Sequence, residues 1–480
     1  MSPSGKAARR AAAAGDVAGG GAAKDAGAVQ SPGSRAARGT PRQVVDPYTP
    51  AAGDARWSAT HYDLDVDYRM ATNRLDGVAR ITGRAHVDLS AIELDLVGLR
   101  ASRVTLDGVR VPHVARGGKL VVQPAAPLPA GSAFALEVVY AGAPKPRRTA
   151  WGLVGWEELE DGVIVASQPT GAPTWFPCND RPANKATYRI RITTEQIYRV
   201  VATGALVDEQ TRSGRTSSTF ACATPAATYL ISVQIGHYVR RVHAGGDVPV
   251  AIVYPPALEQ RVQADLDRLP EMVALFSERF GPYPFPDYTV VVTADDLEIP
   301  LESQGAAVFG ANLIDGHGSE ERLVAHELAH QWFGNSVGVE SWQHIWLNEG
   351  LACYAEWMWS EAAGRESADA LARAFHKRLA GLPQDIVLGD PGAALMFDDR
   401  IYKRGALLVH ALRLTIGERR FWALLHEWTA KHAFATVTTD DFCELAARIG
   451  QQPLDALFDA WLVQTALPPL PGDGKAKRKG

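Results

Sequence analysis

Four residues in the second half of the chain have the types and spacing of a metal centre. His326 and His330 are four residues apart, so on a helix of about 3.6 residues per turn their imidazoles lie on one face. Glu349 adds a carboxylate after eighteen intervening residues. A zinc site with three protein ligands of these types keeps its fourth position open for water or substrate. Glu327 follows the first histidine and can accept a proton from the water that the metal activates.

Two predicted helices must position these groups. Ser319 is a favourable N-cap, two glutamates follow it, and Gly334-Asn335 is a C-terminal stop signal, so we predict a helix between these points. A second helix, from about residue 348 to 360, carries Glu349 in its first turn. The alternative is an amphipathic helix whose histidines are ordinary core residues. The joint occurrence of His, Glu, His and a downstream Glu favours one zinc ion per chain, as in the H-E-x-x-H motif of metalloproteases.

Composition and charge narrow the class of protein. The 480 residues leave room for two or three domains, and a formal net charge of −5 argues against nucleic acid as a partner. No run of eighteen apolar residues is present, so we expect no transmembrane helix and no membrane partner. The four cysteines follow no C-x-x-C pattern and we find no export signal, which together predict reduced thiols in a cytoplasmic protein. The sequence carries no signal for an oligomeric state.

Residues 46–247 are predicted to form a β domain, after a disordered Ala/Gly/Arg-rich tail at residues 1–45. Polar and apolar residues alternate from His61 to Tyr68, which is the pattern of a strand with one buried face. Asp107-Gly108 separates two short apolar runs, and this dipeptide favours the type I′ turn of a hairpin. We therefore expect an antiparallel sheet with one solvated face.

Residues 248–471 are predicted to be mostly helical, ahead of a short basic tail at residues 472–480. Apolar residues recur at alternating steps of four and three from Val262 to Phe280, the period of a helix face, and Pro270 should kink or restart that helix. From Glu320 onward the helical period dominates. The predicted fold class is α+β and multidomain, with an antiparallel β domain before a mostly helical catalytic domain.

Several motifs extend the metal signature and follow one another along the chain. They are Gln168-Pro169-Thr170, Trp175-Phe176-Pro177-Cys178-Asn179-Asp180-Arg181-Pro182 with Lys185-Ala186-Thr187-Tyr188, Ile299-Pro300-Leu301-Glu302-Ser303-Gln304, His326-Glu327-x-x-His330-Gln331-Trp332-Phe333-Gly334-Asn335, Asn348-Glu349-Gly350, and Arg400-Ile401-Tyr402-Lys403-Arg404-Gly405-Ala406. Together they resemble the M1 family of zinc aminopeptidases, which includes aminopeptidase N and leukotriene A4 hydrolase, over about residues 46–471. The resemblance implies a saddle-like β-sheet domain followed by a thermolysin-like catalytic domain.

The resemblance also implies roles for single residues. His326, His330 and Glu349 match the family's zinc ligands, and Glu327 matches its general base. Tyr402 lies in a segment similar to the family's Tyr-x-Lys-Gly, although this chain has Tyr-Lys-Arg-Gly. Its phenol would donate a hydrogen bond to the oxyanion that forms when water attacks the peptide carbonyl. The alternative is a buried helix tyrosine whose hydroxyl is satisfied by the main chain.

An exopeptidase must recognise the end of its substrate. Glu302 falls where the family has Gly-x-Met-Glu-Asn, whose glutamate holds the α-ammonium of the substrate, and Gln168 resembles the glutamine that assists it. A buried charge left unpaired is costly enough to reject a blocked N-terminus. Here the neighbours of the glutamate differ from the family pattern, which puts the shape of the pocket for the first side chain in question. For Glu302 alone, the alternative is a solvated loop carboxylate.

We therefore expect a cytoplasmic zinc aminopeptidase that acts on peptides with a free N-terminus. Many members of the family carry a further helical domain that closes over the cleft. This chain ends just after the expected catalytic domain, so an open cleft is expected. Three alternatives remain: a zinc endopeptidase, an epoxide hydrolase on the same site, and a non-catalytic peptide-binding scaffold.

Overall fold

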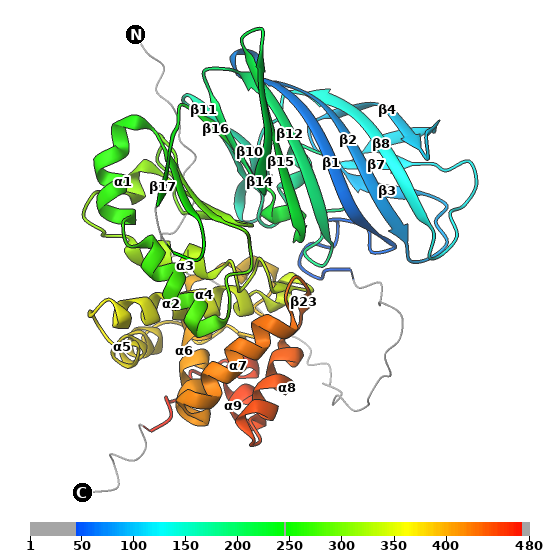
Figure 1. Ribbon diagram of the computed structural model, residues 1–480. Helices are drawn as coiled ribbons and strands as arrows, with labels where there is room; N and C mark the ends of the chain where they lie inside the picture. Colours follow the sequence, from blue (N-terminus) through cyan, green and yellow to red (C-terminus); the bar gives the residue numbers. More distant parts are fainter. Residues whose placement is uncertain (1–44, 244–245, 473–480) are drawn as a thin grey trace, which may run out of the picture. The chain divides into compact units, whose positions relative to one another are not determined.

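The computed structural model describes residues 45–243 and 246–472. Strands dominate the first half of the described chain and helices the second (Figure 1), which confirms the predicted α+β class. The predicted tails, residues 1–45 and 472–480, lie outside the described residues except for Val45 and Gly472.

The largest sheet contains the segment whose alternation predicted a strand. Its strands in spatial order are β14 (Ala205–Arg212), β15 (Arg215–Ala227), β12 (Lys185–Glu195), β1 (Trp57–Arg69), β2 (Arg74–Ala85), β8 (Ala133–Gly142), β4 (Arg100–Leu106) and β5 (Val109–Arg110). In β1, Tyr62, Leu64 and Val66 are buried and the residues between them are half-exposed, as expected for a sheet with one face on a core. The predicted hairpin joins β4 to β5, and Asp107 and Gly108 both have positive φ, 51° and 80°, as a type I′ turn requires.

One strand pair differs from the predicted antiparallel arrangement. β1 pairs with β12 in parallel, with Tyr62 opposite Tyr188, whereas the other pairs of this sheet are antiparallel. Most of the β-rich half separates these two strands in the chain, and so distant a pairing leaves no turn signal in the sequence. Two smaller sheets complete this half, β13 (Arg199–Ala202), β16 (Val233–Gly236), β11 (Gly162–Ala166), β10 (Gly152–Leu159) and β9 (Arg147–Thr149), and β3 (Ile92–Asp95), β7 (Lys119–Val122) and β6 (His113–Arg116).

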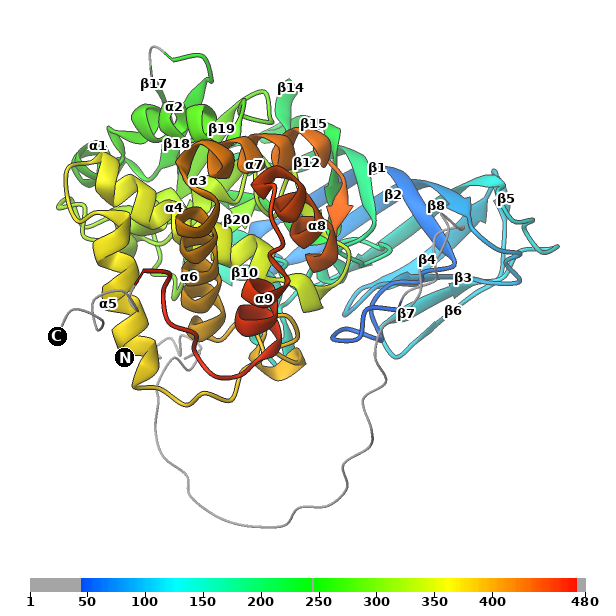
Figure 2. The same ribbon diagram turned by 90° about the horizontal axis from the view of Figure 1, so that it is seen from below.

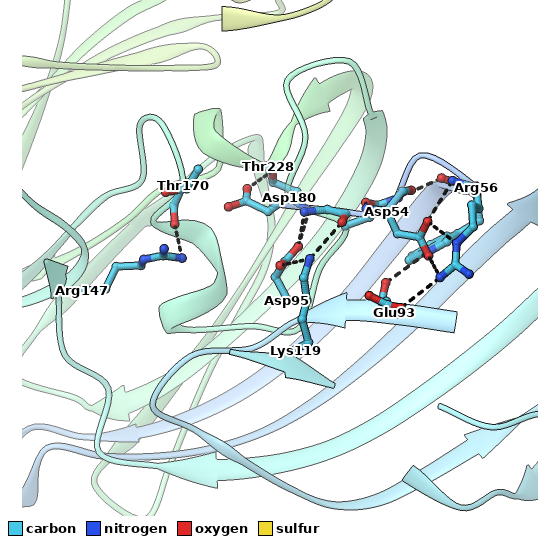
Figure 3. A network of polar contacts seen from close by, with 12 residues as sticks. Asp54, Arg56, Glu93, Asp95, Lys119, Arg147, Thr170, Asp180 and Thr228 are labelled. Atoms are coloured by element: carbon cyan, nitrogen blue, oxygen red, sulfur yellow. Dashed lines mark hydrogen bonds and ion pairs between the residues drawn. The ribbon is translucent and has the colours of Figure 1, made fainter. Parts of the chain in front are cut away.

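A buried polar network connects these sheets to the loop that leads into β12 (Figure 3). Asp95 accepts hydrogen bonds from Lys119 Nζ at 2.6 Å and from the main-chain N–H of Asp180 at 3.2 Å. The Asp180 carboxylate accepts one from Thr228 Oγ1 at 2.6 Å. Burial raises the pKa of Asp180 to about 7. A buried carboxylate is costly unless it is hydrogen-bonded, so Asp95 and Asp180 must keep these partners. The bonds to Asp180 therefore hold the chain in place just ahead of β12.

A mixed sheet begins the helix-rich half. Its strands in spatial order are β17 (Val239–His243), β18 (Val250–Tyr254), β19 (Tyr288–Val292), β21 (Ala306–Phe309) and β20 (Leu301–Ser303), and the two-residue strands β22 (Gly338–Val339) and β23 (Thr436–Val437) pair separately. β20, which carries Glu302, is an edge strand antiparallel to β21. The helices are α1 (Glu259–Leu266), α2 (Leu269–Phe280), α3 (Glu321–Ala329), α4 (Trp346–Ala362), α5 (Ala368–Ala380), α6 (Asp399–Ile416), α7 (Glu418–Lys431), α8 (Thr439–Gly450) and α9 (Asp455–Phe458). Pro270 lies in the first turn of α2, so the predicted restart of this helical stripe is confirmed.

The two helices that carry the predicted metal ligands are α3 and α4, and α4 packs against both α3 and α6 (Figure 2). The predicted N-cap is wrong: α3 begins at Glu321 without a side-chain cap, and the hydroxyl of Ser319 hydrogen-bonds to Asp315 instead. The helix ends at Ala329, ahead of the predicted stop at Gly334-Asn335. Within residues 45–243 and 246–472, none of the helices combines the length and the hydropathy that a membrane span requires.

Candidate active site

The predicted metal ligands come together where α3 faces α4. His326 and His330 are buried, and each places Nε2 at 3.4 Å from the same oxygen, Oε2 of Glu349. Two ligands held about 2.0–2.1 Å from a tetrahedral zinc ion are about 3.3–3.4 Å apart, so these atoms have the spacing that zinc requires. Burial would raise the pKa of Glu349, but the adjacent imidazoles lower it below its usual range. The ionised carboxylate is the form that binds a metal.

Each imidazole is oriented by a hydrogen bond on the side away from Glu349. His326 Nδ1 lies 2.8 Å from Oε1 of Glu356, and His330 Nδ1 lies 3.0 Å from the main-chain oxygen of Phe333. With Nδ1 as the donor in both rings, Nε2 keeps its lone pair for the metal. The sequence analysis missed Glu356. Glu356 follows Glu349 by seven residues on α4, so the two side chains lie two helical turns apart on the same face. This spacing is the signal that could have identified Glu356.

We predict that Glu356→Gln weakens zinc binding while the fold is retained. Glutamine has nearly the same shape but loses the negative charge that polarises His326, and removal of such a partner typically lowers metal affinity by about 10- to 100-fold. The zinc dissociation constant, measured by competition with a chromogenic chelator, checks this. Glu361→Gln, at the exposed end of the same helix, is the matched control and should bind zinc as the wild type does. Equal dissociation constants for all three proteins would contradict the orienting role of Glu356.

Glu327 lies on α3 between the two histidines, and its side chain is buried. Its Oε2 has no hydrogen-bond partner among the described residues, and a buried carboxylate oxygen is costly unless a further group completes its hydrogen bonding. Burial raises the pKa of Glu327. A carboxylate whose pKa is raised towards neutral pH is suited to accept a proton and to return it.

Glu302 and Gln168, from different halves of the chain, meet beside the histidines. Gln168 Nε2 donates to Oε1 of Glu302 at 2.6 Å. A carboxylate oxygen of Glu302, one of Glu327 and a ring nitrogen of His330 all lie within 4.8 Å of one another. Gln331, the residue after His330, holds the hairpin of β20 and β21. Its Oε1 accepts a hydrogen bond at 2.8 Å from the main-chain N–H of Gly305, which lies between the two strands. Glu302 is therefore no solvated loop carboxylate, and the arrangement can hold a cation next to Glu327.

Tyr402 approaches the same centre from α6. Its ring centroid lies 6.0 Å from that of His326. The approach depends on two facing glycines, since a Cβ on Gly350 of α4 would lie 2.8 Å from Cα of Gly405 on α6, and a larger residue at either position would separate the helices. Burial raises the pKa of Tyr402, so the phenol keeps its proton. The carboxylates of Glu349, Glu302 and Glu327 also act on this pKa, so the protonated hydroxyl lies at the centre where a substrate carbonyl would bind.

Two family models cover most of the described chain. The Peptidase M1 N-terminal domain matches residues 58–230, and the Peptidase family M1 domain matches residues 264–461. The first match covers most of the β-rich half, and the second contains the four residues of the zinc signature.

Solved structures and curated proteins agree with these matches. The crystal structure of an M1 zinc metallopeptidase from Deinococcus radiodurans is 30% identical, with a TM-score of 0.81, over 89% of this chain and 98% of that chain. A mutant of the same metallopeptidase bound to a Tyr-Ser-Ala substrate has a TM-score of 0.83 at 30% identity, with the same coverage. Leucyl aminopeptidase from Saccharolobus solfataricus is 24% identical over 85% of this chain and 53% of its own length, and human endoplasmic reticulum aminopeptidase 1 is 26% identical over 81% and 45%. The chain thus spans about half the length of these curated relatives.

Proposed function

The chain belongs to peptidase family M1, and from that premise we propose that it is a zinc-dependent aminopeptidase that removes the N-terminal residue from peptides. The observation that carries this proposal is the position of Glu302, whose carboxylate lies within 4.8 Å of both Glu327 and the zinc-binding His330. A carboxylate at that distance from the reacting centre can bind an α-ammonium one residue away from the scissile bond. The Tyr-Ser-Ala complex of the Deinococcus metallopeptidase supports a peptide as the substrate.

In the proposed mechanism, His326, His330 and Glu349 would hold one zinc ion per chain. When bound, zinc supplies Lewis acidity, which acidifies a water molecule and polarises the substrate carbonyl. Glu327 takes a proton from the attacking water and later delivers it to the nitrogen of the leaving amine. The Tyr402 hydroxyl donates a hydrogen bond to the developing oxyanion.

Glu302 and Gln168 provide the preference for a free N-terminus. The Glu302 carboxylate pairs with the α-ammonium of the substrate, and the side-chain amide of Gln168 holds that carboxylate in place through their 2.6 Å hydrogen bond. An N-acetylated substrate presents no cation, and it would leave the half-buried carboxylate unpaired. We infer that this penalty excludes blocked peptides.

Two further expectations remain proposals. We place the boundary between the β-rich and the catalytic domain near residue 247, which is supported by the gap between the two family matches at residues 230 and 264. We also propose a cytoplasmic location, supported by four cysteines that form no disulfide with one another.

The proposal is tested with a panel of aminoacyl fluorogenic amides, each with a free and with an N-acetylated amino group, assayed with and without a zinc chelator. Chelator-sensitive hydrolysis of the free-amine members alone is the expected result, and the relative rates define the preferred first residue. Hydrolysis of the acetylated members would indicate an endopeptidase. If the protein binds zinc but hydrolyses neither the amides of the panel nor unmodified peptides, it is a non-catalytic scaffold.

A further inference from the structure

The turn that follows the zinc-binding helix is held by side chains from the β-rich half. We call residues 333–337 the post-helix turn. The hydroxyl of Tyr229, which follows β15, donates to the main-chain oxygen of Gly334 at 3.3 Å. Lys185, the first residue of β12, donates from Nζ to the main-chain oxygens of Asn335 at 2.9 Å and Ser336 at 2.7 Å. Three successive carbonyls of the turn are therefore bound from outside the helix-rich half.

The post-helix turn in turn contacts a zinc ligand. Its Asn335 N–H donates to the main-chain oxygen of His330 at 3.0 Å, and the main-chain oxygen of Phe333 accepts from the ring of the same histidine at 3.0 Å. The ring and the main chain of His330 are thus both bonded to this short segment. A displacement of the turn would rotate the imidazole away from Glu349.

The same turn also contacts the strand that carries Glu302. The side-chain amide of Asn335 donates to the main-chain oxygen of Ser303 at 2.9 Å, and Ser303 is the residue after Glu302. The orientation of β20, and with it the direction of the Glu302 carboxylate, therefore depends on the turn.

Among the described residues, the ammonium group of Lys185 makes no other hydrogen bond. Its ammonium group lies among main-chain oxygens, and no carboxylate contributes to its surroundings within the described residues. Burial lowers the pKa of Lys185 to about 7. Gly338 leaves the room it needs, since a Cβ there would lie 2.9 Å from Lys185 Cε. Burying an ammonium group without a counter-ion opposes folding unless its N–H groups form hydrogen bonds. In Lys185 they donate to main-chain oxygens of the post-helix turn.

We propose that Lys185 is a positioning residue, through which the β-rich half holds the post-helix turn and thereby sets both His330 and the strand of Glu302. The inference rests on the proposed function, because it assigns the residue to the zinc and ammonium sites of that function. It makes the β-rich half part of the positioning of the catalytic centre and gives a role to the Lys-Ala-Thr-Tyr segment.

The test compares Lys185→Met with Lys185→Arg, and with Lys119→Met as a matched control. Lys119 is a second largely buried lysine of the β-rich half, bonded to Asp95 and to the main-chain oxygen of Gly53 (Figure 3), with no bond to the turn. The zinc dissociation constant is measured by chelator competition at a temperature where circular dichroism shows each variant folded. Lys185→Met should raise the zinc dissociation constant about 10- to 100-fold and lower kcat at saturating zinc. Lys185→Arg keeps donors for the carbonyls but must fit a larger head beside Gly338, so it should recover only part of the affinity.

Lys119→Met should lower the melting temperature and leave the zinc dissociation constant at the wild-type value. If Lys185→Met does not fold, Lys185→Gln carries the test, because its shorter amide side chain stays polar but cannot reach both carbonyls of the turn, and a zinc affinity reduced several-fold is expected. Unchanged zinc affinity and kcat in Lys185→Met, or an equal loss of affinity in Lys119→Met, would overturn the inference. An inactive wild type that binds zinc would overturn the proposed function instead, and the comparison of zinc affinities would still stand.

Discussion

Glu327→Gln is expected to lower kcat by about a thousandfold or more while the protein still binds zinc. Glutamine keeps the shape of the side chain but cannot accept and return a proton, and loss of a general base removes several kcal/mol of transition-state stabilisation, on the order of 4 kcal/mol for a thousandfold effect. Because Glu327 makes no contact with the metal in the proposed mechanism, the ligand set of His326, His330 and Glu349 is unchanged. The measurement is kcat on a free-amine substrate, together with zinc content by mass spectrometry.

Glu366→Gln, an exposed carboxylate in the loop between α4 and α5, is the control and should keep wild-type kcat and zinc content. A Glu327→Gln protein that turns over at the wild-type rate would remove the proton-transfer role. A variant that loses its zinc would show instead that this carboxylate contributes to metal binding.

Glu302→Ala is expected to lower kcat/KM for free-amine substrates on the order of a hundredfold or more. The kcat/KM for N-acetylated substrates should change little. Truncating one partner of a buried charge pair typically costs about 2–5 kcal/mol, and only a substrate with an α-ammonium forms that pair. The ratio of the two specificity constants is therefore the informative quantity, because a general disturbance of the site would reduce both. Steady-state kinetics on one substrate pair, identical except for the acetyl group, gives this ratio.

Glu298→Ala, an exposed glutamate four residues earlier in the chain, serves as the control and should leave the ratio at its wild-type value. If Glu302→Ala reduces hydrolysis of free and acetylated substrates equally, the carboxylate has no role in binding the ammonium.

The parts of the site that depend on local spacing could be predicted from the sequence. His326 and His330 must share a helix face once the helix forms, whatever surrounds it, and the hairpin at Asp107-Gly108 follows from the φ preferences of two adjacent residues. The N-cap was not predictable in this way. Ser319 has the right residue type, but its hydroxyl bonds to Asp315, and tertiary context overrides such preferences.

Contacts between distant segments were beyond the reach of sequence patterns. The parallel pairing of β1 with β12 and the reach of Lys185 to Asn335 join residues whose separation leaves no periodic signal. Gln168 and Glu302 were paired through a family resemblance, and the 2.6 Å bond between them places them together. Glu356 could be predicted only in part. Its spacing from Glu349 is visible in the sequence, but its partner His326 is on another helix.

The most direct test of a zinc aminopeptidase is the titration of the metal-free protein with zinc in the presence of trialanine and, separately, N-acetyl-trialanine, with products identified by mass spectrometry. The account predicts that free alanine is released from trialanine alone, at a rate that rises linearly until one zinc per chain has been added. Cleavage of the acetylated peptide, release of a C-terminal residue first, or a rate independent of zinc would contradict it.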